Sequence, residues 1–269
     1  MNRIDQCLAQ LKQEGRKALV TYIVAGDPDP QATLPSMHAL VKSGVDIIEL
    51  GVPFSDPMAE GPVIQKGHER ALEHNTSLRD VMALVAEFRQ SNQTTPVVLM
   101  GYANPVERMG YARFAQRAAE VGVDGLLTVD LPPEEAEALN VELKQVGLEN
   151  IFLLAPTSRD DRVKSVAALA SGFIYYVSLK GVTGAGHLDA ANVAENVARI
   201  RQITELPICV GFGIKDGKSA KAIAEHADGA VVGSVLVANM GEMAGREPEA
   251  IASAVAELIA PIRAALDEL

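Results

Sequence analysis

Apolar residues gather in short blocks along this chain, and eight of these blocks are continuous and largely uncharged. Strands that are covered on both faces have this pattern, because neither face needs polar side chains. We therefore predict eight buried strands, within residues 18–26, 42–51, 96–102, 120–130, 151–156, 170–178, 207–213 and 226–234.

Amphipathic segments typical of helices fill the gaps between these blocks. Gly44 and Gly122 close two of the segments, and a glycine just past a helix end accepts the left-handed conformation found there. The alternation of strands and helices predicts an α/β protein built as a (β/α)8 TIM barrel. The predicted helices lie within residues 31–44, 111–122, 134–147, 160–171, 190–203 and 218–227.

An open doubly wound sheet is the alternative α/β fold. We favour the barrel because eight regularly spaced units leave no room for a second domain, and no Pro/Gly/Ser-rich linker divides the chain. We predict a single barrel domain over residues 1–269. An extra helix precedes it within residues 1–17, and a long helix closes it within residues 247–269.

Composition narrows the class of protein. The chain has 24 Lys and Arg against 35 Asp and Glu, a net charge of −11, which disfavours nucleic acid and anionic membranes as partners. Its two cysteines form no CxxC pair, and its five histidines show no metal-ligand spacing. We find no signal peptide and no apolar stretch long enough to span a membrane, so we expect a cytoplasmic protein without a metal.

Glu49 is the first candidate for catalysis, because barrel enzymes carry their active sites at the carboxyl ends of the strands. Strand residues alternate sides, so if Ile48 and Leu50 face the helices, Glu49 faces the barrel axis. Burial raises the pKa of a carboxyl group, which can then hold a proton near neutral pH and act as a base afterwards. The alternative is a structural ion pair.

Glu60 is the second candidate, in the loop that follows the same strand. Prolines on both sides restrict this loop, so its acids are held in place with less loss of entropy. Together Glu49 and Glu60 predict a two-carboxylate site without metal. A loop acid is otherwise simply solvated, and Asp56, which precedes Pro57, is best explained as a turn residue.

Glycine-rich loops follow three of the predicted strands. In barrels, the loops after strands seven and eight frequently bind a phosphate beside a short extra helix. Here they read "GFGIKDGKSA" and "VVGSVLVANM", and we predict that Ser234 opens such a helix. The third loop, residues 178–190, is either a lid over a ligand or a plain surface connection, and its Thr183 is placed to touch a catalytic carboxylate.

The motif "ELGVPFSDPMAEGPVIQ" at residues 49–65 resembles the signature of the tryptophan synthase alpha chain family. The resemblance continues in "AGDPDP", "MGYANPV", "GVDGLLTVDLPPEE", "GVTG", "GFGI" and "VGSVLV", which span the whole chain in order. It implies a lyase that cleaves indole-3-glycerol phosphate to indole and glyceraldehyde 3-phosphate in tryptophan biosynthesis, with no cofactor in this chain.

The resemblance also assigns roles to the two acids. Glu49 would protonate indole C3 and then accept the glycerol hydroxyl proton, while Glu60 would bind the indole N–H. The family usually carries aspartate at position 60, so Glu60→Asp is expected to retain or improve activity. Tyr22 stands where the family commonly has phenylalanine, which adds a hydroxyl that needs a partner.

Further site residues follow from the same resemblance. The family implies an apolar slot for the indole ring, a phosphate site, and a contact face for a pyridoxal-phosphate-dependent beta chain in an αββα heterotetramer. The slot residues are Tyr22, Met100, Leu127, Val129, Leu153, Tyr175, Thr183 and Phe212; the phosphate residues are Gly184, Gly213, Gly233 and Ser234; the partner residues are Pro53, Asp56, Asn104, Pro105, Asp130 and Pro132.

Two other functions are compatible with the sequence. One is a metal-free phosphosugar isomerase or epimerase on the same barrel, because fold alone does not determine chemistry. The other is a non-catalytic subunit that regulates a beta chain, if Glu60 has disabled the lyase. The apolar pocket beside two acids favours the lyase, since a sugar isomerase needs more polar groups there.

Overall fold

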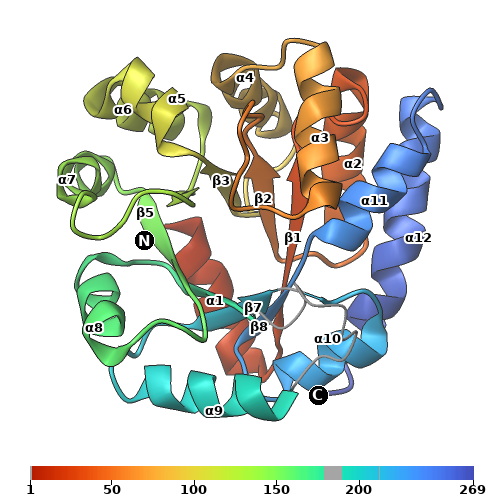
Figure 1. The fold of residues 1–269 in the computed structure, drawn as a ribbon. Coiled ribbons are helices and arrows are strands. Elements are labelled where there is room, and N and C mark those ends of the chain that lie inside the picture. The colour runs from red at the N-terminus through yellow and green to blue at the C-terminus, as the bar shows by residue number, and fades with distance from the viewer. Residues whose placement is uncertain (1, 179–189, 212) are drawn as a thin grey trace.

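A computed structural model describes residues 2–178, 190–211 and 213–269 of the chain. Eight parallel strands pair in sequence order and close into a barrel, as predicted (Figure 1). The strands are β1 Ala18–Val24, β2 Ile47–Gly51, β3 Val97–Gly101, β4 Gly125–Thr128, β5 Glu149–Leu154, β6 Ile174–Val177, β7 Ile208–Gly211 and β8 Gly229–Val232.

Helices form a ring around the strands (Figure 1). Two helices instead of one follow β2, β3 and β8, so the alternation is less regular than the sequence pattern suggested. None of the helices in the described residues is long and apolar enough to cross a membrane. The helices are α1 Arg3–Glu14, α2 Pro30–Lys42, α3 Pro62–Glu73, α4 Leu78–Phe88, α5 Ala103–Met109, α6 Tyr111–Val121, α7 Glu137–Gln145, α8 Asp160–Leu169, α9 Ala190–Arg201, α10 Gly217–Ala224, α11 Ser234–Glu242 and α12 Pro248–Leu266.

The core has two layers, and they show which way each strand residue faces. Ile48 and Leu50 belong to the outer cluster between strands and helices, whereas Ile47 belongs to the inner cluster inside the barrel. Because side chains alternate along a strand, Glu49 points inward, as the sequence predicted. The barrel thus places one acid among apolar side chains on its axis.

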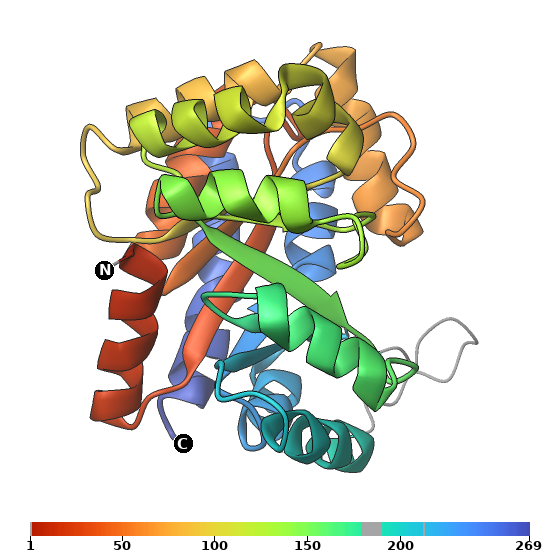
Figure 2. The ribbon, with the colours of Figure 1, turned by 90° about the vertical axis from the view of Figure 1, so that its left-hand side faces the viewer.

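The end of the barrel where the strands begin is sealed by α1, which lies beside the start of β5 in Figure 2. Ile4, Leu8 and Leu11 of this helix are buried against the inner cluster. Three aspartates, each immediately before a strand, also accept a backbone N–H from the preceding strand at 2.8 Å. The pairs are Asp46 with Leu19, Asp124 with Val97, and Asp228 with Ile208. These contacts leave the opposite end of the barrel for the site.

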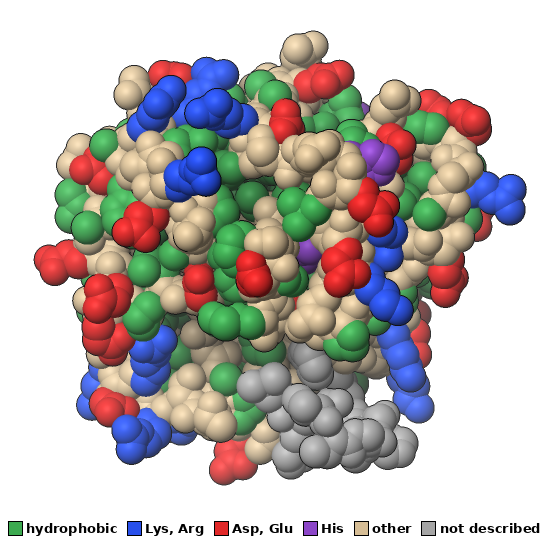
Figure 3. Space-filling view, turned by 45° about the horizontal axis from the view of Figure 1, so that its top comes forward, with side chains coloured by type: hydrophobic (Ala, Val, Ile, Leu, Met, Phe, Trp, Pro, Cys, Tyr) green, Lys and Arg blue, Asp and Glu red, His purple; other side chains and the backbone are tan. Residues whose placement is uncertain are grey.

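Charge is unevenly spread over the surface. Figure 3 shows Asp and Glu side chains scattered over one face, with a group of Lys and Arg side chains at the upper left, in the region of α4 to α6. A groove of about 370 Å³ there is lined by Arg79, Arg113 and Arg117. The acidic chain therefore carries a local group of cationic side chains on these outer helices.

Candidate active site

Glu49 is completely buried, and it lies level with Tyr22 of β1 and Val98 of β3 in the strand register. Burial raises the pKa of its carboxyl group to about 8. Neither carboxylate oxygen has a hydrogen-bond partner among the described residues. No salt bridge to Glu49 is found in that part of the chain either, so its carboxyl group is protonated near neutral pH and is free to exchange a proton.

Glu60 is more enclosed than an ordinary loop acid, since its side chain is only 6% exposed. Oε2 lies 3.1 Å from Nε2 of His68, although the angles there do not meet those of a hydrogen bond. The hydroxyl of Tyr102 is also near: burial first, and then the charge of Glu60, raise the pKa of Tyr102. Glu60 is therefore held in a polar pocket at the mouth of the barrel.

The Glu60 loop is tied down by side chains outside it. The backbone N–H of Ala59 donates to the Tyr102 hydroxyl at 3.0 Å, and Gln65 Nε2 donates to the Glu60 carbonyl at 2.8 Å. The ring of Phe54 stacks on that of Tyr102, with centroids 4.8 Å apart. These contacts limit where the Glu60 carboxylate can go.

A cavity of about 270 Å³ opens beside the two acids. Its walls come from β1, β3, β6 and β8, from the N-terminal end of α3, and from the loops after β7 and β8. The lining residues are Tyr22, Gly61, Pro62, Val63, Ile64, Met100, Tyr175, Gly213, Ile214, Val231, Gly233 and Ser234. Most of this wall is apolar, which suits a flat hydrophobic ligand.

Glu49 does not line the cavity itself, but it lies close behind the residues that do. Its charge contributes to raising the pKa of both Tyr22 and Tyr175, after the larger effect of burial. Both tyrosine hydroxyls lie close against glycines: a Cβ on Gly51 would clash with the Tyr22 oxygen, and one on Gly211 would clash with the Tyr175 oxygen. Glycine is required at both strand ends for the rings to lie there.

The two predicted phosphate loops meet at one side of this cavity. Gly213 has a left-handed backbone with φ of 78°, and Gly233 caps α11, whose first residue is Ser234. A helix N-terminus has unpaired N–H groups and a positive dipole end, both of which favour an anion. A Cβ on Gly233 would lie 3.3 Å from Tyr22 Cβ, so this loop also packs tightly on the pocket wall.

Comparison with known proteins decides the family. The family model described as "Tryptophan synthase alpha chain" matches residues 8–266. The chain belongs to the tryptophan synthase alpha chain family. A tryptophan synthase alpha chain from Nitrosococcus oceani is 59% identical over 267 residues, covering 99% of this chain and 98% of the relative. The alpha chain from Marinobacter nauticus is 54% identical, covering 100% and 99%.

Solved structures of tryptophan synthase alpha chains share the whole fold. A crystal structure of tryptophan synthase subunit alpha from Legionella pneumophila matches with a TM-score of 0.93 and 44% identity, covering 100% of both chains. A chain of tryptophan synthase from Mycobacterium tuberculosis, in an aminoacrylate-bound form, matches with a TM-score of 0.87 and 33% identity, covering 99% of this chain and all of that one. The barrel predicted from the sequence is thus confirmed.

Most predicted pocket residues are gathered in one place. Leu127, Val129 and Leu153 join Tyr22, Met100 and Tyr175 in or against the cluster inside the barrel. Thr183, Gly184 and Phe212 lie outside the described residues, as does most of the third glycine-rich loop, residues 179–189. The roles of all these residues in the alpha chain remain predictions.

The predicted partner residues lie at the same end of the barrel. Asp56, Asn104 and Asp130 are exposed, and Pro105 and Pro132 are half-buried. Asp130 accepts the backbone N–H of Ala103 at 2.7 Å, which joins the loop after β4 to the start of α5. Pro53 is buried, so in this conformation it offers little surface to a beta chain.

Sequence reasoning missed two residues that contact Glu60. Tyr102 stands inside the quoted motif "MGYANPV", one residue past the end of β3, a position that faces the site in a barrel. His68 lies on α3, eight positions after Glu60, and is 1% exposed. The sequence feature that could have pointed to His68 is the hydroxyl of Tyr22. This hydroxyl needs a polar partner, and His68 lies 3.2 Å from it.

Proposed function

We propose that this alpha chain cleaves indole-3-glycerol phosphate to indole and glyceraldehyde 3-phosphate. The observation that carries the proposal is Glu49, a fully buried acid whose pKa is raised to about 8, directly behind an apolar cavity. Such a group is a proton donor at neutral pH and becomes a base once it has given up its proton.

Glu49 performs two proton transfers in the proposed reaction. It first gives its proton to C3 of the indole ring, which places positive charge on the ring nitrogen. The bond between C3 and the glycerol side chain then breaks, and its electrons return to the ring. The hydroxyl on the departing carbon loses its proton to Glu49 and becomes the aldehyde. Glu49 ends protonated, so the chain is ready for another cycle and nothing is oxidised or reduced.

Glu60 stabilises the charge that forms between these transfers. A carboxylate that accepts the indole N–H is best placed for the intermediate, in which the nitrogen carries positive charge. The apolar walls formed by Met100 and Tyr22 exclude water around the ring. Gly213, Gly233 and Ser234 bind the phosphate and fix the glycerol chain relative to Glu49.

The partner we propose is a beta chain of tryptophan synthase, in an αββα assembly. Pyridoxal phosphate belongs to that beta chain, which consumes the indole. Support comes from the predicted contact residues, since Asp56, Asn104 and Asp130 are exposed at the end of the barrel where the site opens. Indole leaving the cavity would there enter the partner directly.

Release of indole from indole-3-glycerol phosphate tests the proposal. The chain contains no Trp, so indole fluorescence is read without Trp background. Wild type should release indole, and Glu49→Gln, which keeps the shape but cannot transfer a proton, should lose about 10³-fold or more in kcat. The matched control is Glu69→Gln on the exposed face of α3. No indole from wild type, or equal rates for wild type and Glu49→Gln, would refute the proposal.

A further inference from the structure

His68 is a buried histidine whose hydrogen bonds determine which of its nitrogens carries the proton. The backbone N–H of Phe54 donates to Nδ1 at 3.0 Å, so Nδ1 is the acceptor. The proton of the neutral ring is therefore on Nε2, which makes Nε2–H a donor. The side chain is 1% exposed, and the oxygens of Tyr22 and Glu60 lie 3.2 Å and 3.1 Å from Nε2, so this donor faces the site.

Two acceptors compete for this single N–H. The Tyr22 oxygen lies 3.2 Å from Nε2 and forms the hydrogen bond, while Oε2 of Glu60 lies 3.1 Å away without good angles. Oε2 is already within hydrogen-bonding distance of Nε2, so a change in the direction of the Glu60 carboxylate, without a change in distance, would move the hydrogen bond from tyrosine to glutamate. The carboxylate gains more from it, since a hydrogen bond to a charged group is stronger than one to a neutral group.

We propose that His68 is a positioning residue, whose Nε2–H holds the Glu60 carboxylate in the orientation that accepts the indole N–H. This inference rests on the proposed function. The backbone of Phe54 orients the histidine, the histidine orients Glu60, and Glu60 contacts the substrate. When Glu60 has turned away, the Tyr22 hydroxyl accepts the same N–H. The hydroxyl then has a hydrogen-bond partner in a slot that is otherwise apolar.

Two substitutions separate this role from simple anchoring of the loop. Gln at position 68 extends an amide to where Nε2 lies, and so keeps the donor to Glu60. Asn is shorter: its oxygen can still accept the Phe54 N–H, but its nitrogen does not reach Glu60. We expect His68→Gln to stay close to wild type and His68→Asn to lose about 10- to 100-fold in kcat with little change in KM.

Kinetics of indole release by the full chain, with far-UV circular dichroism of each variant to verify folding, give the result. The opposite order, with Asn active and Gln inactive, would assign His68 to anchoring the Phe54 backbone and overturn the proposal. Equal kcat in all three proteins would also overturn it. If wild type itself releases no indole, the proposed function fails instead.

Nuclear magnetic resonance of wild type gives a test that needs no stable variant. Two-bond nitrogen–proton correlations of ¹⁵N-histidine-labelled chain show which ring nitrogen of His68 is protonated at neutral pH. We expect a protonated Nε2 and a bare Nδ1, with the Nε2–H resonance shifted in Glu60→Gln. A proton on Nδ1, or an Nε2–H resonance that is the same in wild type and Glu60→Gln, would refute the inference.

Discussion

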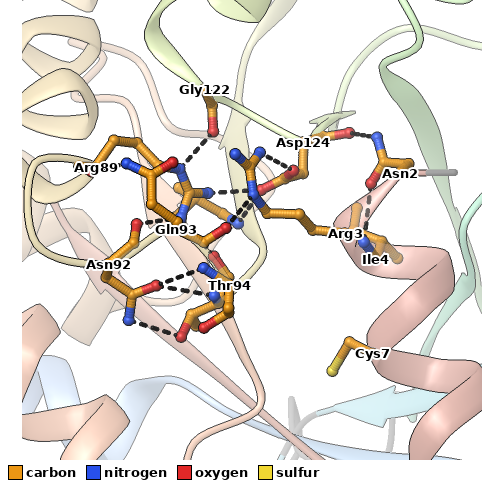
Figure 4. A network of polar contacts seen from close by, with 12 residues as sticks. Asn2, Arg3, Ile4, Cys7, Arg89, Asn92, Gln93, Thr94, Gly122 and Asp124 are labelled. Atoms are coloured by element: carbon orange, nitrogen blue, oxygen red, sulfur yellow. Dashed lines mark hydrogen bonds and ion pairs between the residues drawn. The ribbon is translucent and has the colours of Figure 1, made fainter.

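Arg89, just past the end of α4, donates through Nη2 to Oδ2 of Asp124 at 2.7 Å, with both side chains almost completely buried (Figure 4). The same carboxylate accepts the N–H of Val97 through Oδ2 and Nη1 of Arg3 through Oδ1. Burial lowers the pKa of Arg89 to about 10, and Asp124 opposes that shift. The Asp124 carboxylate thus joins α1, the end of α4 and β3 at the end of the barrel where the strands begin.

Asp124→Asn should destabilise the chain strongly, because it leaves the buried guanidinium of Arg89 without its counter-charge. Breaking a buried ion pair from one side typically costs about 3–5 kcal/mol in the free energy of unfolding. Urea unfolding followed by circular dichroism measures it. The control is Glu120→Gln, which removes an exposed partner of Arg117 and should change the free energy by about 0.5 kcal/mol or less. Similar midpoints for both variants would contradict the prediction.

Glu49 should also make stability depend on pH. Its pKa is about 8 in the folded chain and 4.5 when unperturbed, so the folded state binds a proton that the unfolded state releases. This contribution is fully present below pH about 4.5 and is lost as pH rises through about 8. Glu49→Gln lacks the titration, so its stability relative to wild type should rise by on the order of 3–5 kcal/mol across that range. Parallel pH curves for the two proteins would count against a buried, protonated Glu49.

The order and direction of the strands could be predicted because strands buried on both faces appear in the sequence as continuous apolar blocks, separated by amphipathic helices. The inward direction of Glu49 also followed, since Ile48 and Leu50 are apolar neighbours that must face the helices. The contacts of His68 could not be predicted in this way. They depend on how α3 returns over the mouth of the barrel, and nothing in local periodicity records that three-dimensional approach.

The same limit explains why Glu60 looked like an ordinary loop acid. Its burial comes from Tyr102 of a different loop and from His68 of the next helix, which are 42 and 8 positions away in the sequence. The restricting prolines were visible, but the groups that enclose the carboxylate were not. The sequence therefore predicts Glu60 as an isolated acid, and only the fold shows which side chains enclose it.

Glu60→Asp tests whether the enclosure matters. From sequence alone, restoring the aspartate usual in the family predicts retained or improved activity. The contact with His68 leads us to the opposite prediction, because one methylene less withdraws the carboxylate from His68 Nε2, now 3.1 Å away. We expect kcat for indole release to fall by about 10- to 100-fold. The deficit should not grow when His68→Asn is added, since both changes break the same contact. Full activity of Glu60→Asp would show that catalysis does not depend on the contact between the carboxylate of residue 60 and His68.

A beta chain should accelerate the proposed cleavage. The loop that carries Glu60 also contains Asp56, an exposed predicted contact, so binding a partner there changes which orientations the loop and its acid adopt. We expect indole release by the isolated chain to be much slower than with a tryptophan synthase beta chain added.

Asp56→Asn should weaken this stimulation, because any contact that the Asp56 charge makes with the beta chain is lost. Glu69→Gln, on the outer face of α3, should keep the stimulation. Titrating the beta chain at fixed substrate and following glyceraldehyde 3-phosphate, which the beta chain does not consume, measures the effect. Equal rates with and without the partner would show that the loop holds Glu60 in its working position unaided.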